Sequence, residues 1–375
     1  MNASDETPAS ELSVEEKIQL WGEMTRIRCF EQCAIQHYCA GRMGGWLNVQ
    51  IGQDSIPVVI RSLMTVHDHS ISSFRCLGHA LASGMSMRSC MAELFGKATG
   101  SSKGKGGMHS FQSPETRFWG GYGVTGAQTP LACGLAFALK HRGEAGAVFC
   151  CLGDGAMNQG AFHEAMNLSA LFHLPVVFVI ENNQFAMSAS VERSSAYSGC
   201  LAKRAEGYGM AWDKAEGEDL LQLRRVLAAA ALRARQECRP SLIEVATYRY
   251  EGFSVADAQK FKYRTKAEVT DRMENHDPIQ LWGAHLMAAG IATAEELKAI
   301  RKQAIQEANE SAEFAKTSPY PSPEAILQDV YWEVDMKTAA GPSGRHFFET
   351  HDLSLRRSGK GQSAQALSSL RQKSS

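Results

Sequence analysis

Apolar residues recur at helical spacing near the start of the chain. Ser13 and Glu16 have the spacing of a capping box, in which each side chain accepts a backbone hydrogen bond at the start of a helix. The helix predicted from there runs to Gly41. The apolar residues on or near one of its faces are Ile18, Trp21, Ile27 and Phe30. This pattern predicts a helix that packs one face against a core.

Short apolar runs alternate with further helical segments along most of the chain. The predicted strands are residues 71–74, 147–152, 175–180 and 241–247. The predicted helices are residues 87–95, 127–140, a helix that begins near Asn158, and residues 219–237 and 295–314. This alternation predicts an α/β fold with a parallel sheet flanked by helices on both faces.

Polar segments interrupt this pattern in the interior and at both ends. Residues 97–123 are dense in Gly, Ser and Lys, and are too long for a simple connection in a compact domain. Residues 251–266 form a second polar loop, and such loops often carry function. We expect a polar extension over residues 1–12, one domain over residues 13–335, and a polar, disordered tail over residues 341–375.

Composition narrows the class of protein. The 375 residues are 44% hydrophobic and 21% charged, as in globular proteins, and the net charge of -1 predicts no nucleic-acid partner. No window approaches 18 uninterrupted apolar residues, so we expect no membrane span. Residues 1–10 resemble neither a secretory signal nor a transit peptide, which favours the cytoplasm. The ten cysteines lack CxxC spacing, as expected of reduced thiols.

Polar residues follow two of the predicted strands. Asp154 follows residues 147–152, and Asn182 and Asn183 follow residues 175–180. Open α/β sheets bind ligands at the carboxyl ends of their strands. Gly155 lets the backbone approach an anion there, and the helix that begins near Asn158 directs free N–H groups toward it. Mg²⁺ prefers oxygen ligands and is commonly bound together with phosphates, so this pattern predicts a diphosphate and magnesium site.

Longer motifs carry a resemblance to a known family. They are IGQDS at 51–55, MAELFGKATG at 91–100, SKGKGGMH at 102–109, the run from GDGAMNQG to IENN at 153–183, and YRTKAEV at 263–269. On these motifs, residues 20–332 resemble the α subunit of the E1 component of 2-oxo acid dehydrogenase complexes, the pyruvate and acetoin dehydrogenase group. The resemblance implies the diphosphate-binding half of the thiamine-diphosphate-binding fold, with thiamine diphosphate and Mg²⁺ as cofactors.

The resemblance also implies site residues. Asp154 and Asn183 match metal-binding side chains, and the carbonyl of Phe185 matches a backbone metal ligand. The positions that match cofactor-binding residues are Phe74 and Arg75 beside the diphosphate, Gly123 and Thr125 at the aminopyrimidine, and Gly153, Gly155, Ala156 and Asn183 around the diphosphate and metal.

Activity and partners follow from the same resemblance. The enzymes of this group decarboxylate a 2-oxo acid, or cleave an acyloin, and transfer the acyl unit to lipoamide. Their α subunit joins an E1 β-like subunit in an α₂β₂ heterotetramer, and the glutamate that activates the cofactor lies on the β subunit. A lipoyl-bearing E2 is the further partner implied.

The chain departs from this group where histidines are usual. Asn48, Leu77 and Phe253 stand at such positions, and we expect them to line the pocket together with His109, which is either structural or catalytic. Neither Leu nor Phe can transfer a proton. This favours an alternative, thiamine-diphosphate-dependent acyl transfer or C–C bond formation with a non-lipoyl acceptor in a specialised pathway. A third alternative is an inactive paralogue that binds cofactor and partner only. Ser254 stands at a regulatory phosphorylation position of mitochondrial relatives, without the usual flanking residues.

Four other patterns have simpler interpretations. Residues 121–126 read GxGxxG, but residues 116–120 do not resemble the strand that a dinucleotide site needs. Residues 103–107 lack the spacing of a nucleotide-binding loop. Residues 67–69, His-Asp-His, fit a polar turn better than a metal site, and Cys29 and Cys33 on one helix face lack a second pair of zinc ligands.

Overall fold

The computed structural model describes residues 12–330. This range leaves out residues 1–11 of the expected extension and the expected tail at 341–375. It also leaves out the end of the domain expected over residues 13–335, so the limits of that domain stay a prediction. The described residues up to Tyr320 form one compact unit. A second unit begins at Pro321, and its described part holds a short 3₁₀ helix, η5 (Pro323–Leu327).

A six-stranded sheet forms the centre of the first unit, in the order β2-β1-β3-β4-β8-β7. Every neighbouring pair is parallel, which confirms the predicted fold class. A separate two-stranded ribbon pairs β5 with β6. The strands are β1 (His69–Ser73), β2 (Phe118–Tyr122), β3 (Val148–Gly153), β4 (Val176–Asn182), β5 (Phe185–Ala186), β6 (Ala189–Ser190), β7 (Ala211–Glu216) and β8 (Ser241–Ala246).

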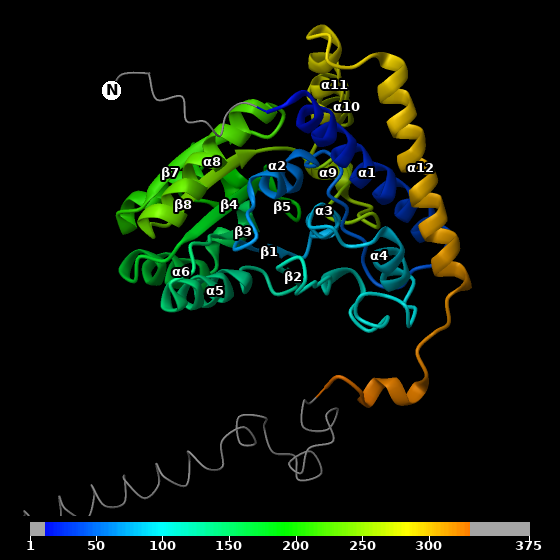
Figure 1. The fold of residues 1–375 in the computed structure, drawn as a ribbon, viewed down its shortest axis with the longest axis horizontal. Helices are drawn as coiled ribbons and strands as arrows, with labels where there is room; N and C mark the ends of the chain where they lie inside the picture. Colours follow the sequence, from blue (N-terminus) through cyan, green and yellow to red (C-terminus); the bar gives the residue numbers. More distant parts are fainter. Residues whose placement is uncertain (1–11, 331–375) are drawn as a thin grey trace, which may run out of the picture. The chain divides into compact units, whose positions relative to one another are not determined.

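Helices cover both faces of the sheet (Figure 1). The helices of the first unit are α1 (Val14–Cys39), α2 (Ser55–Leu63), α3 (Leu77–Ala82), α4 (Met87–Leu94), α5 (Gln128–Arg142), α6 (Gly160–Leu171), α7 (Val191–Ser194), α8 (Leu220–Glu237), α9 (Lys260–Tyr263), α10 (Lys266–Asn275), α11 (Pro278–Ala288) and α12 (Ala294–Thr317). The described part of this unit also has three 3₁₀ segments: η2 (Gly107–His109), η3 (Asp154–Asn158) and η4 (Leu201–Tyr208). No helix in the described range is long and apolar enough to cross a membrane.

Alternation along the strands divides the core into two layers. Val148 and Cys150 of β3 belong to the apolar cluster that includes residues of α5 and α6. Their neighbours Phe149 and Cys151 belong to the cluster that includes residues of α1, α2 and α8. Successive side chains of a strand point to opposite faces, so a continuous apolar run is what a sheet covered on both faces requires.

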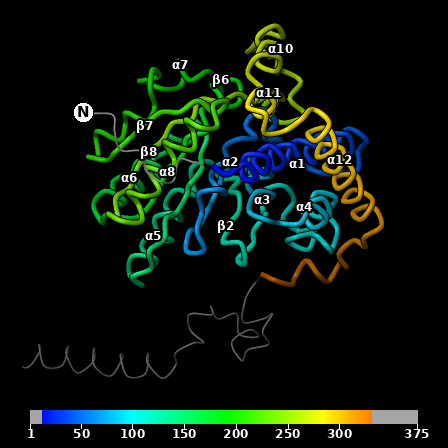
Figure 2. Tube along the Cα trace, turned by 45° about the horizontal axis from the view of Figure 1, so that its top comes forward, coloured from blue at the N-terminus to red at the C-terminus, as the bar shows by residue number. Residues whose placement is uncertain are grey.

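The capping box predicts the start of α1 correctly. The Ser13 hydroxyl accepts from the Glu16 N–H at 3.1 Å, and the Glu16 carboxylate accepts from the Ser13 N–H at 2.8 Å. A second capping box, Thr293 with Glu296, starts α12. α1 and α12 lie side by side in both views (Figures 1 and 2).

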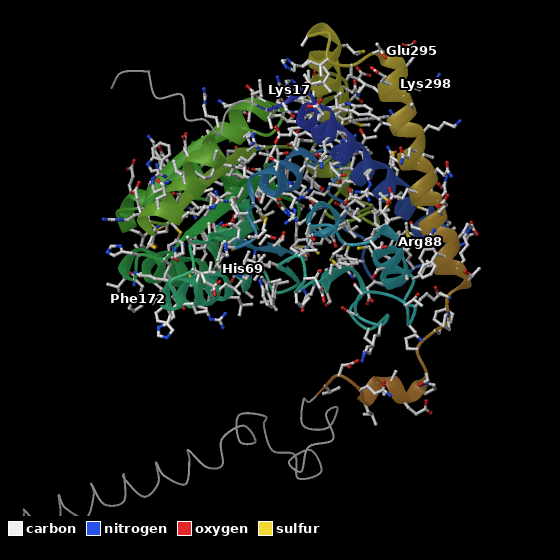
Figure 3. All side chains as sticks on the ribbon, in the orientation of Figure 1. Lys17, His69, Arg88, Phe172, Glu295 and Lys298 are labelled. Carbon is white, nitrogen blue, oxygen red and sulfur yellow. The ribbon has the colours of Figure 1, made fainter. Side chains whose placement is uncertain are left out.

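α12 also packs beside α4. Arg88 of α4 points toward α12 (Figure 3), and its guanidinium lies 3.7 Å from the Glu310 carboxylate. Both side chains are at least half exposed, so this pair contributes little stability. The apolar residues of α4 and α12, rather than their charges, hold these helices together.

The prediction for residues 116–120 is wrong. Residues 118–122 form β2, which pairs in parallel with β1 at one edge of the sheet. The strand has two glycines because it lies very close to the segment after β1: a methyl group at Gly121 would lie 2.4 Å from Cys76 Sγ. The helix predicted near Asn158 begins at Gly160, after the 3₁₀ turn η3.

Candidate active site

A cavity of about 270 Å³ lies at the carboxyl ends of the central strands. Its lining comes from the ends of β1, β3 and β4 and from the segments that follow β5 and β8. The lining residues used below are Phe74, Arg75, Thr125, Gly153, Asp154, Gly155, Ala156, Glu181, Asn183, Phe185, Met187, Arg249 and Phe253. Residues far apart in the sequence therefore meet where parallel sheets bind ligands.

Most of the predicted site residues line this cavity. The exceptions are Asn48, Leu77, His109 and Gly123. Leu77 is fully buried in the apolar core. Gly123 faces His109, since a methyl group there would lie 3.4 Å from His109 Nδ1.

Asp154 has one carboxylate oxygen without a partner. Its Oδ1 accepts from the Gly155 N–H at 2.9 Å, while Oδ2 is buried and makes no hydrogen bond. Burial raises the pKa of Asp154 to about 6, against the opposing effects of that hydrogen bond and of Arg249. A buried carboxylate oxygen without a donor is costly unless a cation or donor meets it.

Two other predicted metal ligands point to one position. Nη1 of Arg249 lies 3.2 Å from Asn183 Oδ1 and 2.7 Å from the Phe185 carbonyl oxygen. The two oxygens therefore converge on a place where positive charge is stabilised. Asn182, by contrast, donates to Glu244 of β8 at 2.7 Å and does not line the cavity.

Reasoning from the sequence missed Arg249. It is 2% exposed, and it lies three residues after the end of β8. A cation shortly after a third predicted parallel strand was the available signal. Gln53, within the motif at 51–55, was also missed: its side-chain oxygen accepts from Asn183 Nδ2 at 2.9 Å and so orients the Asn183 amide.

Arg75 supplies a second buried guanidinium. It donates to the Val49 carbonyl and, at 2.9 Å, to the Phe253 carbonyl. Burial, with Arg249 nearby, lowers its pKa to about 9, so the side chain is still cationic at neutral pH. Two guanidiniums in one cavity repel each other unless an anion lies between them. The arrangement therefore suits a diphosphate.

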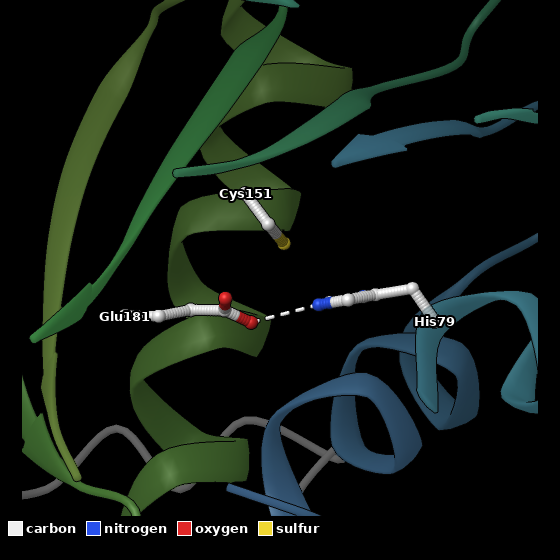
Figure 4. A group of neighbouring side chains, drawn as sticks. All are labelled: His79, Cys151 and Glu181. Atoms are coloured by element: carbon white, nitrogen blue, oxygen red, sulfur yellow. Dashed lines mark hydrogen bonds and ion pairs between the residues drawn. The ribbon is translucent and has the colours of Figure 1, made fainter. Parts of the chain in front are cut away.

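Glu181 connects the cavity to a buried polar cluster (Figure 4). Its Oε1 lies 2.7 Å from His79 Nε2 and accepts from Gln50 Nε2 at 3.1 Å. Cys151 Sγ completes a group whose ligand atoms lie within 4.8 Å of one another, the only such group in the described range. Burial raises the pKa of the Cys151 thiol well above its usual range, so it stays protonated. The cluster holds the end of β4 in place by hydrogen bonds.

The aromatic rings of Phe74 and Phe253 also line the cavity. The Phe74 and Phe253 rings are 5.6 Å apart at 60°. Phe253 also meets Trp46 edge-on at 5.8 Å, and Phe74 meets His109 at 6.1 Å. Burial lowers the pKa of His109, so its imidazole is neutral at pH 7. Asn48 lies behind this surface and donates to the Phe253 carbonyl at 2.6 Å.

One buried carboxylate organises the Gly- and Lys-rich loop. Glu93 of α4 is fully buried, and its two oxygens accept from four backbone N–H groups at 2.8–2.9 Å. The donors are Ser102, Gly104, Gly106 and Gly107. A methyl group at Gly104 would lie 2.5 Å from the Gly96 backbone, so the loop can adopt this conformation only with a glycine at that position.

The alternative metal patterns do not assemble in the described residues. The Asp68 carboxylate accepts from the Ala147 N–H and from Arg235, while His69 accepts from Trp119 Nε1 at 2.7 Å. Cys33 contacts the Ala308 carbonyl. Ser254 is 3% exposed.

The parallel α/β fold, with a polar cavity at its strand ends that contains two guanidiniums and a buried carboxyl group, is that of an α/β protein that binds its ligand where the strands end. The chain matches the family "Dehydrogenase E1 component" over residues 22–324. It is 41% identical over 326 residues to the pyruvate dehydrogenase E1 component subunit alpha of Rhizobium meliloti, covering 86% of this chain and 91% of that relative. It is 40% identical to the corresponding subunit of Zymomonas mobilis over 84% of this chain and 88% of that one.

A mitochondrial pyruvate dehydrogenase E1 component subunit alpha, from Schizosaccharomyces pombe, is 36% identical over 92% of this chain and 84% of its own length. The chain belongs to the Dehydrogenase E1 component family, which depends on thiamine diphosphate. This family membership confirms the predicted function, decarboxylation of a 2-oxo acid with acyl transfer to lipoamide. The alternative with a non-lipoyl acceptor is not favoured.

Proposed function

We propose that the chain is the α subunit of an α₂β₂ E1 enzyme that decarboxylates a 2-oxo acid and passes the acyl unit to the lipoyl group of an E2 protein. One observation carries the proposal: the cavity combines a buried, unpartnered Asp154 oxygen with the converging oxygens of Asn183 and Phe185 and with two guanidiniums. Such a donor set suits a divalent cation bound to a diphosphate.

The residues fit both cofactors. Asp154, Asn183 and the Phe185 carbonyl would hold Mg²⁺, and Arg75 and Arg249 would hold the diphosphate. Gly155 packs closely against the segment after β4, since a methyl group there would lie 2.4 Å from Ala186 Cβ. When bound, thiamine diphosphate supplies the carbanion chemistry, which no protein side chain offers.

The side of the cavity near the proposed aminopyrimidine contacts is open. Gly123 and Thr125 are both exposed, and so is Val124 between them at 73%. E1 α subunits generally pair with β subunits, and a partner over this open side would cover Val124. The β subunit would contribute the activating glutamate. We place the assembly in the cytoplasm.

Loss of metal binding tests this function. We expect Asp154→Ala to weaken thiamine diphosphate binding in the presence of Mg²⁺ by 100-fold or more, on the order of 3 kcal/mol, because one metal ligand is lost. The measurement is calorimetry on the complex with its β subunit. Asp213→Ala, at an exposed position on β7, is the matched control and should bind normally. Unchanged affinity in Asp154→Ala would exclude the proposed metal site.

A further inference from the structure

The lining of the cavity contains both polar and apolar side chains. The polar ones are Asp154, Asn183 and the two guanidiniums of Arg75 and Arg249, which account for the diphosphate and the metal. The apolar ones include Phe74 and Phe253. These two rings would face the rings of the cofactor and the donor that reacts there.

Three aromatic residues, Trp46, Phe74 and Phe253, form a continuous surface that we call the aromatic wall. Phe253 is its centre, with an edge-to-face contact to Phe74 at 5.6 Å and 60° and another to Trp46 at 5.8 Å and 81°. Phe74 and Phe253 are half-buried, whereas Trp46 is 59% exposed. The wall therefore extends from the cavity to the surface and presents apolar area to whatever enters.

Hydrogen bonds hold the backbone of Phe253, the central residue of the wall. The Phe253 carbonyl accepts from Asn48 Nδ2 at 2.6 Å and from Arg75 Nη2 at 2.9 Å. The Phe253 N–H donates to Asp257 Oδ2 at 2.9 Å, and the same oxygen accepts from Tyr263 at 2.7 Å. These bonds fix the backbone at Phe253, and the edge-to-face contacts with Phe74 and Trp46 position its ring, so a ligand has less to order on binding.

We propose that the aromatic wall selects a 2-oxo acid donor whose side chain is larger and more apolar than a methyl group. This inference rests on the proposed function. Polar groups on a donor side chain would lose their hydration against these rings without gaining a partner. A single methyl group would leave most of the wall in contact with water. One further methylene in a hydrophobic pocket is worth about 10-fold or more in kcat/KM.

The test compares donors on the complex of the chain with its β subunit, thiamine diphosphate and Mg²⁺. The rate of CO₂ release, with ferricyanide as electron acceptor, is measured for pyruvate, 2-oxobutanoate, 4-methyl-2-oxopentanoate and phenylpyruvate. We expect kcat/KM for the best of the larger donors to exceed that for pyruvate by about 10-fold or more. A preference for pyruvate overturns the inference and leaves the proposed function standing. No CO₂ release from any donor, with cofactor bound by calorimetry, overturns the proposed function instead.

Variants separate the wall from general effects on folding. Phe253→Ala should abolish the preference, while Phe253→Leu, which keeps apolar bulk, should retain most of it. Ile305→Ala removes a 45% exposed apolar side chain on α12 and is the matched control. A binding readout is independent of turnover: the larger donors should change tryptophan fluorescence, and Trp46→Phe should remove that change. Equal donor preference in wild type and Phe253→Ala would contradict the role of the wall.

Discussion

The Arg249 guanidinium lies 3.2 Å from Oδ1 of Asn183, although 66 positions separate the two residues. Asn183 follows β4 and Arg249 follows β8, and these strands are neighbours in the sheet. The pairing of β4 with β8 therefore sets the distance between a proposed metal ligand and a proposed diphosphate ligand. The Arg249 guanidinium also donates to the Phe185 and Met187 carbonyls, so it orients the segment after β4 as well.

We predict that Arg249→Lys weakens thiamine diphosphate binding by about 10- to 100-fold. Lysine keeps the charge but cannot make several hydrogen bonds in one plane, which here hold two carbonyls and the Asn183 amide. Calorimetric titration of the complex measures this effect. Arg193→Lys, in the short helix α7, is an exposed control. A variant with wild-type affinity would show that charge alone, and not the fork geometry, is required at this position.

Glu93 should determine the order of the loop at residues 101–107. Hydrogen bonds to a charged group contribute about 1.5–3 kcal/mol each, with a smaller net sum. We expect Glu93→Gln to lower the free energy of unfolding by about 2 kcal/mol or more, and to speed amide exchange at Ser102, Gly104, Gly106 and Gly107. Glu310→Gln removes a surface ion pair and should change stability by less than about 1 kcal/mol. Unaltered exchange at the four amides would mean that the backbone holds the loop without the carboxylate.

The stability of the fold should depend on pH through Glu31. This carboxyl is fully buried, and burial, with the Asp54 charge nearby, raises its pKa to about 8. The folded state therefore binds more protons than the unfolded state between about pH 4.5 and pH 8, so stability falls as pH rises through that window. The slope is at most about 1.4 kcal/mol per pH unit. Glu31→Gln should flatten this part of the curve in urea unfolding measured from pH 5 to pH 8. An identical pH dependence in the variant would show that Glu31 is ionised throughout.

Local signals in the sequence predicted the elements that have local causes. The capping box at Ser13 fixes the start of α1, and the apolar run before Asp154 is long enough to specify β3. Contacts between distant residues could not be predicted in this way. Gln53 accepts a hydrogen bond from Asn183, 130 positions away, and Glu93 meets amides of a later loop. The spacing of one segment carries no information about such partners, because the fold brings them together.

Gly121 is the clearest case of a residue explained by a distant neighbour, and it gives the last prediction. A methyl group at this position would lie 2.4 Å from Cys76 Sγ and 2.7 Å from the Ser73 carbonyl oxygen. Ser73 belongs to the strand that pairs with β2, so relief of the clash requires movement of the sheet edge. We expect Gly121→Ala to lower the free energy of unfolding by about 1–3 kcal/mol, the usual cost of overpacking.

Gly134, an exposed residue inside α5, is the matched control because a methyl group there meets nothing within 4 Å. Gly134→Ala should raise stability by about 0.5–1 kcal/mol, since alanine favours the helix. Urea unfolding of both variants in parallel measures whether each substitution lowers or raises the free energy of unfolding. β2 leads directly to Gly123 and Thr125, so Gly121→Ala should also weaken cofactor binding. Gly134→Ala, measured on the chain without its β subunit, should leave cofactor binding unchanged. If the two substitutions had the same effect on stability, the close packing of β2 against the segment after β1 would not be the reason for the glycine.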